Sequence, residues 1–212
     1  MEFKEAILNY AEQPINRQLL QSLLVGYKRP YDKINELVKQ GILIPVKAGI
    51  YVPGKNVNIA GPETFLLANH IFGPSYISMD SALAYWGLIP EKVFETTSAT
   101  SKHYKENKTS VGKFSYAHLP LPYYSFGIKM MALTPKQIVL IASPEKALCD
   151  KIITTSGLLL RSVKQVKELL MEDWRIEKDV LRNLNNKEIS TWIIDAPKST
   201  SIDMLVQTLQ LL

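Results

Sequence analysis

The chain of 212 residues contains a single cysteine, Cys149, and only three histidines. One thiol excludes an intramolecular disulfide and a cysteine-rich zinc site. His70, His103 and His118 lie far apart in the sequence, and none has a second metal ligand at helical spacing. We therefore expect no metal and no cofactor, and we interpret Cys149 as a buried structural thiol.

Long apolar runs are also missing. No window approaches the roughly 18 consecutive apolar residues that a membrane-spanning helix needs. The first five residues are mixed in charge and have no apolar segment, unlike a secretory signal. Together with the low cysteine content, these features predict a cytoplasmic protein without a membrane partner.

Common catalytic signatures are absent as well. The sequence has no glycine-rich phosphate loop, no Gly-x-Ser-x-Gly turn and no dinucleotide-binding fingerprint. Glu145 and Asp150 could form a carboxylate pair, but a glutamate in the first turn of a helix is already explained by the helix dipole. We predict that the protein is not an enzyme. The alternative is a metal-dependent nucleic-acid-processing enzyme, which would need clustered carboxylates.

The most informative stretch, Lys28 to Pro53, combines a short basic helix with two β-strands. Ile34, Leu37 and Val38 fall on one face at helical spacing, which predicts an amphipathic helix. A proline suits its first turn, and Gly41 suits the position directly after its last turn. Two β-branched runs then flank a Lys-Ala-Gly turn, and this pattern predicts a two-stranded hairpin.

Two further helices are predicted ahead of this stretch. Residues 2–12 place apolar side chains on one helical face, and Asn16 is a good N-cap for a second helix over residues 17–25. Three helices followed by a hairpin form the layout of a winged helix-turn-helix DNA-binding domain. We assign this domain to residues 1–58, and the polar linker of residues 56–61 marks its boundary.

The phase of the third helix selects the residues that would meet DNA. With the apolar face turned inward, Arg29 and Lys33 are placed to contact bases. Lys28 and Lys39 are placed to contact phosphates, and Lys47 at the hairpin tip could reach flanking phosphates. With Tyr31, on the border of the exposed face, and the acidic Glu36, the predicted DNA-binding residues are Lys28, Arg29, Tyr31, Lys33, Glu36, Lys39 and Lys47.

Positive charge is concentrated in the same part of the chain. Residues 1–60 contain eight lysines and arginines against five acids, whereas residues 61–212 contain seventeen against fifteen. This bias fits a polyanionic partner, and we predict double-stranded DNA. A second polar and basic stretch, Lys102 to Lys108, is interpreted as an exposed loop, with a second nucleic-acid contact as the alternative.

Residues 59–212 are predicted to form a mixed α/β domain with a helical C-terminal end, which places the whole chain in the α+β class. Proline–glutamate pairs open two helices, after Gly61 and after Ser143, and Ser78 caps a short helix between them. Strands that form a small antiparallel sheet are predicted over residues 93–97, 111–119, 123–132 and 137–142. Later helices are predicted over residues 163–172, 176–183, 187–194 and 200–212.

Several motifs follow one another along the chain. The hairpin contains Gly49-Ile-Tyr51; then come Tyr76-Ile-Ser-Met-Asp-Ser-Ala-Leu83, Trp86-Gly-Leu-Ile-Pro90 and Ser143-Pro-Glu-Lys-Ala-Leu-Cys-Asp150. In this order they resemble the AbiEi family of antitoxins from bacterial type IV toxin–antitoxin systems, over most of residues 15–155. The resemblance implies an N-terminal DNA-binding domain that represses its own operon. It also implies a C-terminal domain that counteracts a toxin of the nucleotidyltransferase type in phage defence.

The resemblance leaves several questions open. Family antitoxins need not form a stable complex with the toxin, and the family's recognition segment is commonly richer in arginine. Here Asp32 and Glu36 stand among the basic residues, which leaves the base preference undecided. The alternative function is a one-component transcriptional regulator whose second domain binds a ligand or a protein. Monomers on repeated half-sites and a symmetric dimer both fit the sequence.

Overall fold

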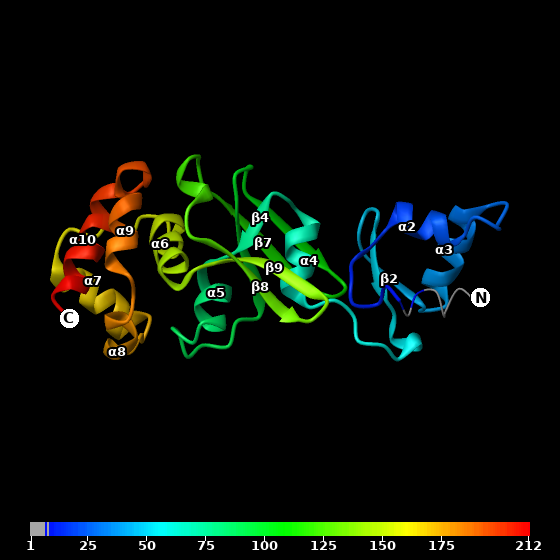
Figure 1. Cartoon of the computed structure of the whole chain (residues 1–212), viewed down its shortest axis with the longest axis horizontal. Coiled ribbons are helices and arrows are strands. Elements are labelled where there is room, and N and C mark those ends of the chain that lie inside the picture. The colour runs from blue at the N-terminus through cyan, green and yellow to red at the C-terminus, as the bar shows by residue number, and fades with distance from the viewer. Residues whose placement is uncertain (1–6, 8) are drawn as a thin grey trace.

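The computed structural model describes Ile7 and residues 9–212, which form an elongated molecule of three successive parts (Figure 1). The N-terminal part contains a three-stranded sheet within residues 15–53, the central part contains a six-stranded sheet within residues 75–142, and helices form the C-terminal part of residues 155–212. This mixture confirms the α+β class. The predicted helix over residues 2–12 lies mainly outside the described residues, and residues 9–12 form turns.

The N-terminal part contains the later helices and the hairpin in their predicted order. Its elements are β1 (Ile15–Asn16), α2 (Arg17–Leu23), α3 (Pro30–Lys39), β2 (Leu43–Lys47) and β3 (Ile50–Pro53), and β3 pairs with both other strands. Asn16 caps α2 as predicted, because its side-chain oxygen accepts a hydrogen bond from the Leu19 amide at 2.8 Å. Gly41 follows α3 with a φ of 67°, the left-handed conformation that commonly ends helices.

A small apolar core holds these elements together. Ile34 and Leu37 are buried, as their helical spacing predicts, so the opposite face of α3 is exposed. Val46 and Val52 of the hairpin pack instead into the large core of the central part. The boundary at residue 58 stays a prediction; beyond β3 the chain forms a short 3-10 helix, η1 (Lys55–Val57), and an irregular segment. The small core consists of Ile7, Ile15, Leu20, Leu24, Ile34, Leu37, Ile42 and Leu43.

The central sheet has the strand order β6-β7-β5-β4-β9-β8. Its strands are β4 (Ser75–Ile77), β5 (Glu95–Thr100), β6 (Lys105–Thr109), β7 (Gly112–His118), β8 (Ile128–Thr134) and β9 (Gln137–Ala142). The prediction of an antiparallel sheet is wrong, because β5 pairs with β7, and β4 with β9, in parallel. The hairpins β6–β7 and β8–β9 each join the sheet through their second strand, which leaves the first strand at the edge.

Three local predictions are also wrong. The polar stretch of residues 102–108 is not simply a loop, since its second half forms part of the edge strand β6. Tyr123 does not begin a strand, because it lies in a short 3-10 helix, η2 (Tyr123–Ser125). The first helix of the central part begins after Glu63 rather than at Pro62. The Glu63 backbone is extended, and its amide donates to the side chain of Gln137 at 2.8 Å.

Helices cover both faces of the sheet. On one face lies α4 (Thr64–Ile71), where the Tyr116 hydroxyl donates to the carbonyl oxygen of Ala68 at 2.8 Å. On the other lies α6 (Pro144–Thr154), where the Tyr76 hydroxyl donates to Asp150 at 3.0 Å. Across β5, Tyr76 aligns with Ala117 rather than with Tyr116, so the two tyrosines point to opposite faces. Helix α5 (Met79–Tyr85) packs against β5 and α6.

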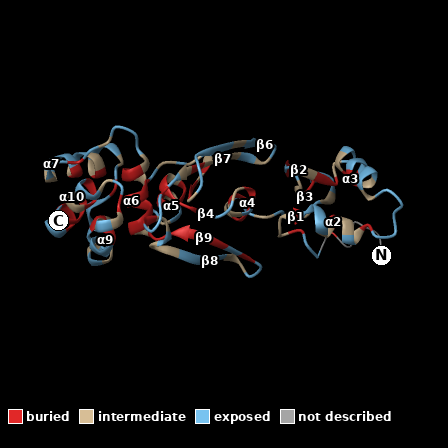
Figure 2. Cartoon of the chain, turned by 90° about the horizontal axis from the view of Figure 1, so that it is seen from above, coloured by how far each residue is buried: buried red, intermediate tan, exposed pale blue. Residues whose placement is uncertain are grey.

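Helix α6 lies between the sheet and the C-terminal helices and is buried on nearly all sides (Figure 2). Pro144 opens it, as predicted, and the Ser143 side chain caps it by accepting a hydrogen bond from the Lys146 amide. Cys149 is fully buried, as predicted, and burial raises the pKa of its thiol. Among the described residues, no helix is long and apolar enough to cross a membrane. The C-terminal elements are α7 (Val163–Lys167), the π-helix η3 (Glu168–Asp173), α8 (Lys178–Arg182), α9 (Asn186–Trp192), η4 (Ile193–Asp195) and α10 (Ser199–Gln210).

Candidate functional site

The exposed face of α3 is where the sequence places its DNA contacts. Burial of Ile34 and Leu37 turns the opposite side of the helix to solvent. The structure brings six of the seven predicted residues together here; Lys33 is half-buried and the others are exposed. These six are Lys28, Arg29, Tyr31, Lys33, Glu36 and Lys39.

Acidic neighbours reduce the positive charge of this face. The Arg29 guanidinium lies 3.8 Å from the carboxylate of Asp32, and both side chains are largely exposed. Lys33 Nζ lies 2.9 Å from a carboxylate oxygen of Glu36 and 5.6 Å from the centre of the Tyr27 ring. The exposed Arg29–Asp32 pair contributes little free energy, so a phosphate or base could displace Asp32 from Arg29.

Arg17 belongs to the same surface, although sequence reasoning missed it. It is the first residue of α2, and its guanidinium carbon lies 5.8 Å from the centre of the exposed Tyr31 ring. Its backbone amide donates to the carbonyl oxygen of Gly49 in the hairpin turn at 3.0 Å. The start of α2, the exposed face of α3 and the hairpin turn therefore lie close together. An arginine directly after the helix cap Asn16 was the available signal.

The seventh predicted residue, Lys47, has a different position. Its ammonium donates to the carbonyl oxygen of Ile71, the last residue of α4, at 2.7 Å. It also lies 5.8 Å from the centre of the Phe72 ring. In this conformation the Lys47 ammonium is turned toward the central part of the molecule, because a helix C-terminus attracts cations.

The second basic stretch has internal partners as well. His118 Nδ1 donates to the carbonyl oxygen of Lys102 at 2.9 Å, and the ring centres of His103 and His118 are 6.4 Å apart. The Tyr104 hydroxyl donates to Glu106. Lys105 and Lys108 are exposed on β6, so this edge of the sheet is basic without forming a free loop.

The carboxylate of Asp150, which is fully buried in α6, accepts four hydrogen bonds. One oxygen accepts hydrogen bonds from the hydroxyls of Tyr76 (3.0 Å) and Ser78 (2.7 Å). The other accepts from the Tyr123 hydroxyl (3.0 Å) and from Lys146 Nζ (2.7 Å). Strand β4, the start of α5, η2 and α6 all meet at this carboxylate, so it joins the elements of the central part.

Burial governs the protonation of this network. It lowers the pKa of Lys146, although the adjacent Asp150 opposes the shift. It raises the pKa of Tyr76 and Tyr123 well above the usual value for tyrosine, and the charge of Asp150 adds to the effect. The Lys146 ammonium also lies over the Tyr123 ring, 3.3 Å from its centre. The network is enclosed and joins four elements of the central part.

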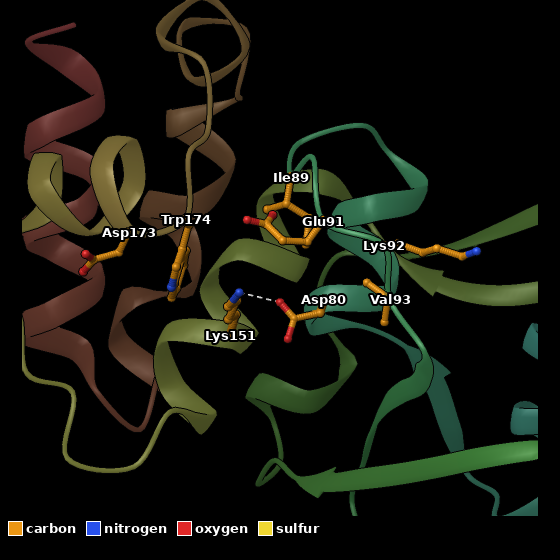
Figure 3. A pocket seen from close by; sticks show the side chains of 8 residues that line it. All are labelled: Asp80, Ile89, Glu91, Lys92, Val93, Lys151, Asp173 and Trp174. Atoms are coloured by element: carbon orange, nitrogen blue, oxygen red, sulfur yellow. Dashed lines mark hydrogen bonds and ion pairs between the residues drawn. The ribbon is translucent and has the colours of Figure 1, made fainter.

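A cleft of about 330 Å³ lies where the segment of residues 89–93 approaches α6 and the end of η3 (Figure 3). The Lys151 ammonium forms an ion pair with Asp80 and lies 4.3 Å from the centre of the Trp174 ring. In Figure 3 these three side chains converge, whereas Lys92 and Asp173 point away. The lining residues are Asp80, Ile89, Glu91, Lys92, Val93, Lys151, Asp173 and Trp174.

Two ion pairs lie at this cleft, Lys151 with Asp80 and Arg175 with Glu91. Arg175 Nε donates to Glu91 at 3.0 Å, and this bond holds the pKa of Glu91 below its usual value. Arg175 has a φ of 51°, which is rare for a residue other than glycine. In the part of the chain that the structure describes, no three His, Cys, Asp or Glu side chains are grouped so that they could hold a metal ion.

Comparison with known proteins gives a likeness of fold. No protein-family model and no curated protein sequence matches the chain. Three chains of solved structures match, among them the RV2827C protein from Mycobacterium tuberculosis. The likeness covers 97% of this chain and 75% of that one, with a TM-score of 0.62 and 14% sequence identity. At this identity the likeness shows a shared fold and nothing about function.

Proposed function

We propose that the protein is a transcriptional autorepressor and antitoxin with no catalytic activity of its own, acting in the cytoplasm. Residues 1–58 would form a winged helix-turn-helix domain that binds double-stranded operator DNA of its own operon. Residues 59–212 would counteract a nucleotidyltransferase-type toxin, with or without direct contact. The motif order that resembles the AbiEi family is the basis for the antitoxin part.

The observation that carries the DNA-binding part is the exposed face of α3. A helix with a buried apolar side presents Arg29 and Lys33 at its N-terminal end, where recognition helices contact bases. Lys28 and Lys39 extend this face, and Arg17 with Tyr31 adds a cationic and aromatic border. The residues of this face are suited to phosphate and base contacts.

A gel-shift titration with DNA from upstream of the gene tests this proposal. The wild-type chain should shift that DNA, and Arg29→Ala combined with Lys33→Ala should weaken binding by at least about tenfold, since each lost base contact is worth about 1–3 kcal/mol. Lys164→Ala with Lys167→Ala removes the same charge from α7 at the other end of the molecule and should leave binding unchanged. Equal binding by both double variants would exclude α3 as the recognition helix.

Co-expression tests the antitoxin part separately. A nucleotidyltransferase-type toxin encoded beside this gene should arrest growth alone, and the chain should restore growth even as the Arg29→Ala, Lys33→Ala variant. Restoration by that variant would separate neutralisation from DNA binding. Failure of the wild-type chain to restore growth would contradict the antitoxin role.

One observation favours the alternative of a one-component regulator. The cleft beside Lys151 and Trp174 is of a size that can hold a small ligand. A ligand that entered it would have to compete with the internal ion pair of Lys151 and Asp80. Small molecules that raise the melting temperature of the wild-type chain, but not of Trp174→Ala, would support this alternative.

A further inference from the structure

The hairpin tip is bound to the central part of the molecule through the end of α4. Lys47 donates to the carbonyl oxygen of Ile71 at 2.7 Å, and Lys102 donates to that of Gly73. The two ammonium groups lie 5.8 Å and 5.4 Å from the centre of the same Phe72 ring. Lys47 of the N-terminal part and Lys102 of the central part thus both contact the segment that ends α4. We call this cluster the α4 clamp (Lys47, Ile71, Phe72, Gly73 and Lys102).

The clamp is extended along strand β2. The Ser110 hydroxyl, in the turn between β6 and β7, donates to the carbonyl oxygen of Pro45 at 3.1 Å. Val46 and Val52 of the hairpin are buried with the core of the central part. The hairpin is therefore packed on the central part, with its tip lysine engaged there.

A second contact between the same parts involves the turn between β8 and β9. Lys136 Nζ lies 3.1 Å from the carboxylate of Glu12, and the Gln13 side chain donates to the Lys136 carbonyl oxygen. These side chains are half-buried or exposed, so water and salt weaken the contact. This contact therefore adds little to the free energy that holds the two parts together.

We propose that Lys47 is shared between operator DNA and the α4 clamp, so that DNA binding and release of the clamp are coupled. This inference rests on the DNA-binding function proposed above. A single ammonium cannot keep its place between Ile71 and Phe72 and also move out to a backbone phosphate. Occupation of the clamp therefore weakens DNA binding, and DNA binding opens the clamp by the same factor.

The coupling gives the central part a means to regulate the operon. A partner that binds near α4 and tightens the clamp would lower the affinity for DNA. A partner that displaces Lys47 from Phe72 would raise it. In both cases the signal reaches the N-terminal part through the hairpin rather than through α3.

A reversible tether across the clamp tests the coupling in the full chain. Pro45→Cys with Ser110→Cys introduces thiols at two exposed positions, where the Ser110 hydroxyl lies 3.1 Å from the backbone carbonyl oxygen of Pro45. The native Cys149 is fully buried and should not react. A short, cleavable bismaleimide should then hold the hairpin on the central part. We expect the tethered protein to bind operator DNA about tenfold more weakly than the same protein after cleavage of the linker. Ser110→Cys alone, treated with the same reagent, controls for modification without a tether.

A second variant tests, without a tether, whether a loosened clamp raises the affinity for DNA. Phe72→Leu keeps an apolar side chain but removes the ring that faces both lysines, so the affinity for DNA should rise several-fold. Circular dichroism would verify that Phe72→Leu is folded. Spin labels at positions 45 and 110 should also move apart when operator DNA is added.

The outcomes separate this inference from the proposed function. Tethered and cleaved proteins that bind operator DNA equally, with labels that do not move, would overturn the coupling and leave the DNA-binding function intact. Absence of operator binding in every form would overturn the proposed function and the coupling together. Weaker binding by the tethered form, with control protein unaffected, would support both.

Discussion

At the scale of single residues, the stability of the central part depends most on the buried carboxylate of Asp150. Its carboxylate accepts four hydrogen bonds, and the donors come from four separate elements of the central part. A buried carboxylate is stable only when its hydrogen-bonding capacity is satisfied and a cation lies nearby. Lys146, one helical turn away, supplies that charge.

Replacing this carboxylate should destabilise the fold strongly. Asp150→Asn would leave the Lys146 ammonium buried without its counter-charge, and we expect a loss of about 3–5 kcal/mol in the free energy of unfolding. Urea denaturation measures this loss. Asp80→Asn is a matched control, because Asp80 is 42% exposed in its pair with Lys151 and should lose less than about 1 kcal/mol. Similar losses for both variants would contradict the role of Asp150.

The tyrosines of the network predict a distinct pH dependence. Burial raises the pKa of Tyr76 in the folded chain well above its usual value of 10.0, so the folded state keeps this proton at a pH where the unfolded state loses it. Stability from this group is present below about pH 10 and is lost as the pH rises further. Between pH 8 and pH 11 the melting temperature should be measured for both proteins. Above about pH 10 it should fall less steeply for Tyr76→Phe than for the wild type. Parallel curves would show that Tyr76 does not titrate in this way.

At the scale of elements, local patterns predicted local structure. Asn16, Pro30 and Gly41 mark the ends of α2 and α3 because caps, prolines and left-handed glycines act on neighbouring residues. The helical spacing of the apolar residues predicted which face of α3 is buried, and therefore that Arg29 is exposed. Each of these features is determined by residues close by in the sequence, so it can be predicted from one sequence alone.

Non-local features could not be predicted in the same way. The parallel pairing of β4 with β9 joins residues far apart in the sequence, and only packing around α6 decides it. The sequence predicts a DNA contact for Lys47 because a hairpin tip is usually exposed. The carbonyl oxygen that accepts its hydrogen bond belongs to Ile71, in another element. The motif residues Tyr76, Ser78 and Asp150 gave no sign that they share one hydrogen-bond network.

The end of α3 offers a test at this scale. Gly41→Ala would put a side chain in the left-handed region, and its Cβ would lie 2.8 Å from the side-chain nitrogen of Asn56. That nitrogen donates to the carbonyl oxygen of Gln40 at 2.7 Å, a bond that any shift of Asn56 would disturb. We expect the free energy of unfolding to fall by about 1–2 kcal/mol.

Gly26→Ala is the control for this change. An added Cβ at Gly26 would meet no atom within 4 Å, so its effect should stay within about 1 kcal/mol of zero. Denaturation of the two variants under the same conditions gives the comparison. If Gly41→Ala were no less stable than Gly26→Ala, the left-handed helix end would not matter for stability.

At the scale of the whole molecule, the three parts lie in a row and the hairpin links the first to the second (Figure 1). The C-terminal helices share the core of the central part through α6, while the N-terminal part keeps a small core of its own. This arrangement suits a protein in which one end binds DNA and the rest regulates it. The hairpin, packed on both, is the element through which the two ends would communicate.

The salt dependence of operator binding tests the DNA-binding claim most directly. Affinity of the full chain for its own upstream DNA, measured against a scrambled duplex at several salt concentrations, should fall steeply as salt rises. The logarithmic slope should be about 0.9 for each phosphate contacted, and Lys28→Ala with Lys39→Ala should reduce it by about two. We predict preference for the upstream duplex in the wild type and a shallower slope in this variant. Equal affinity for both duplexes, or a slope that the variant leaves unchanged, would contradict the claim that α3 binds operator DNA.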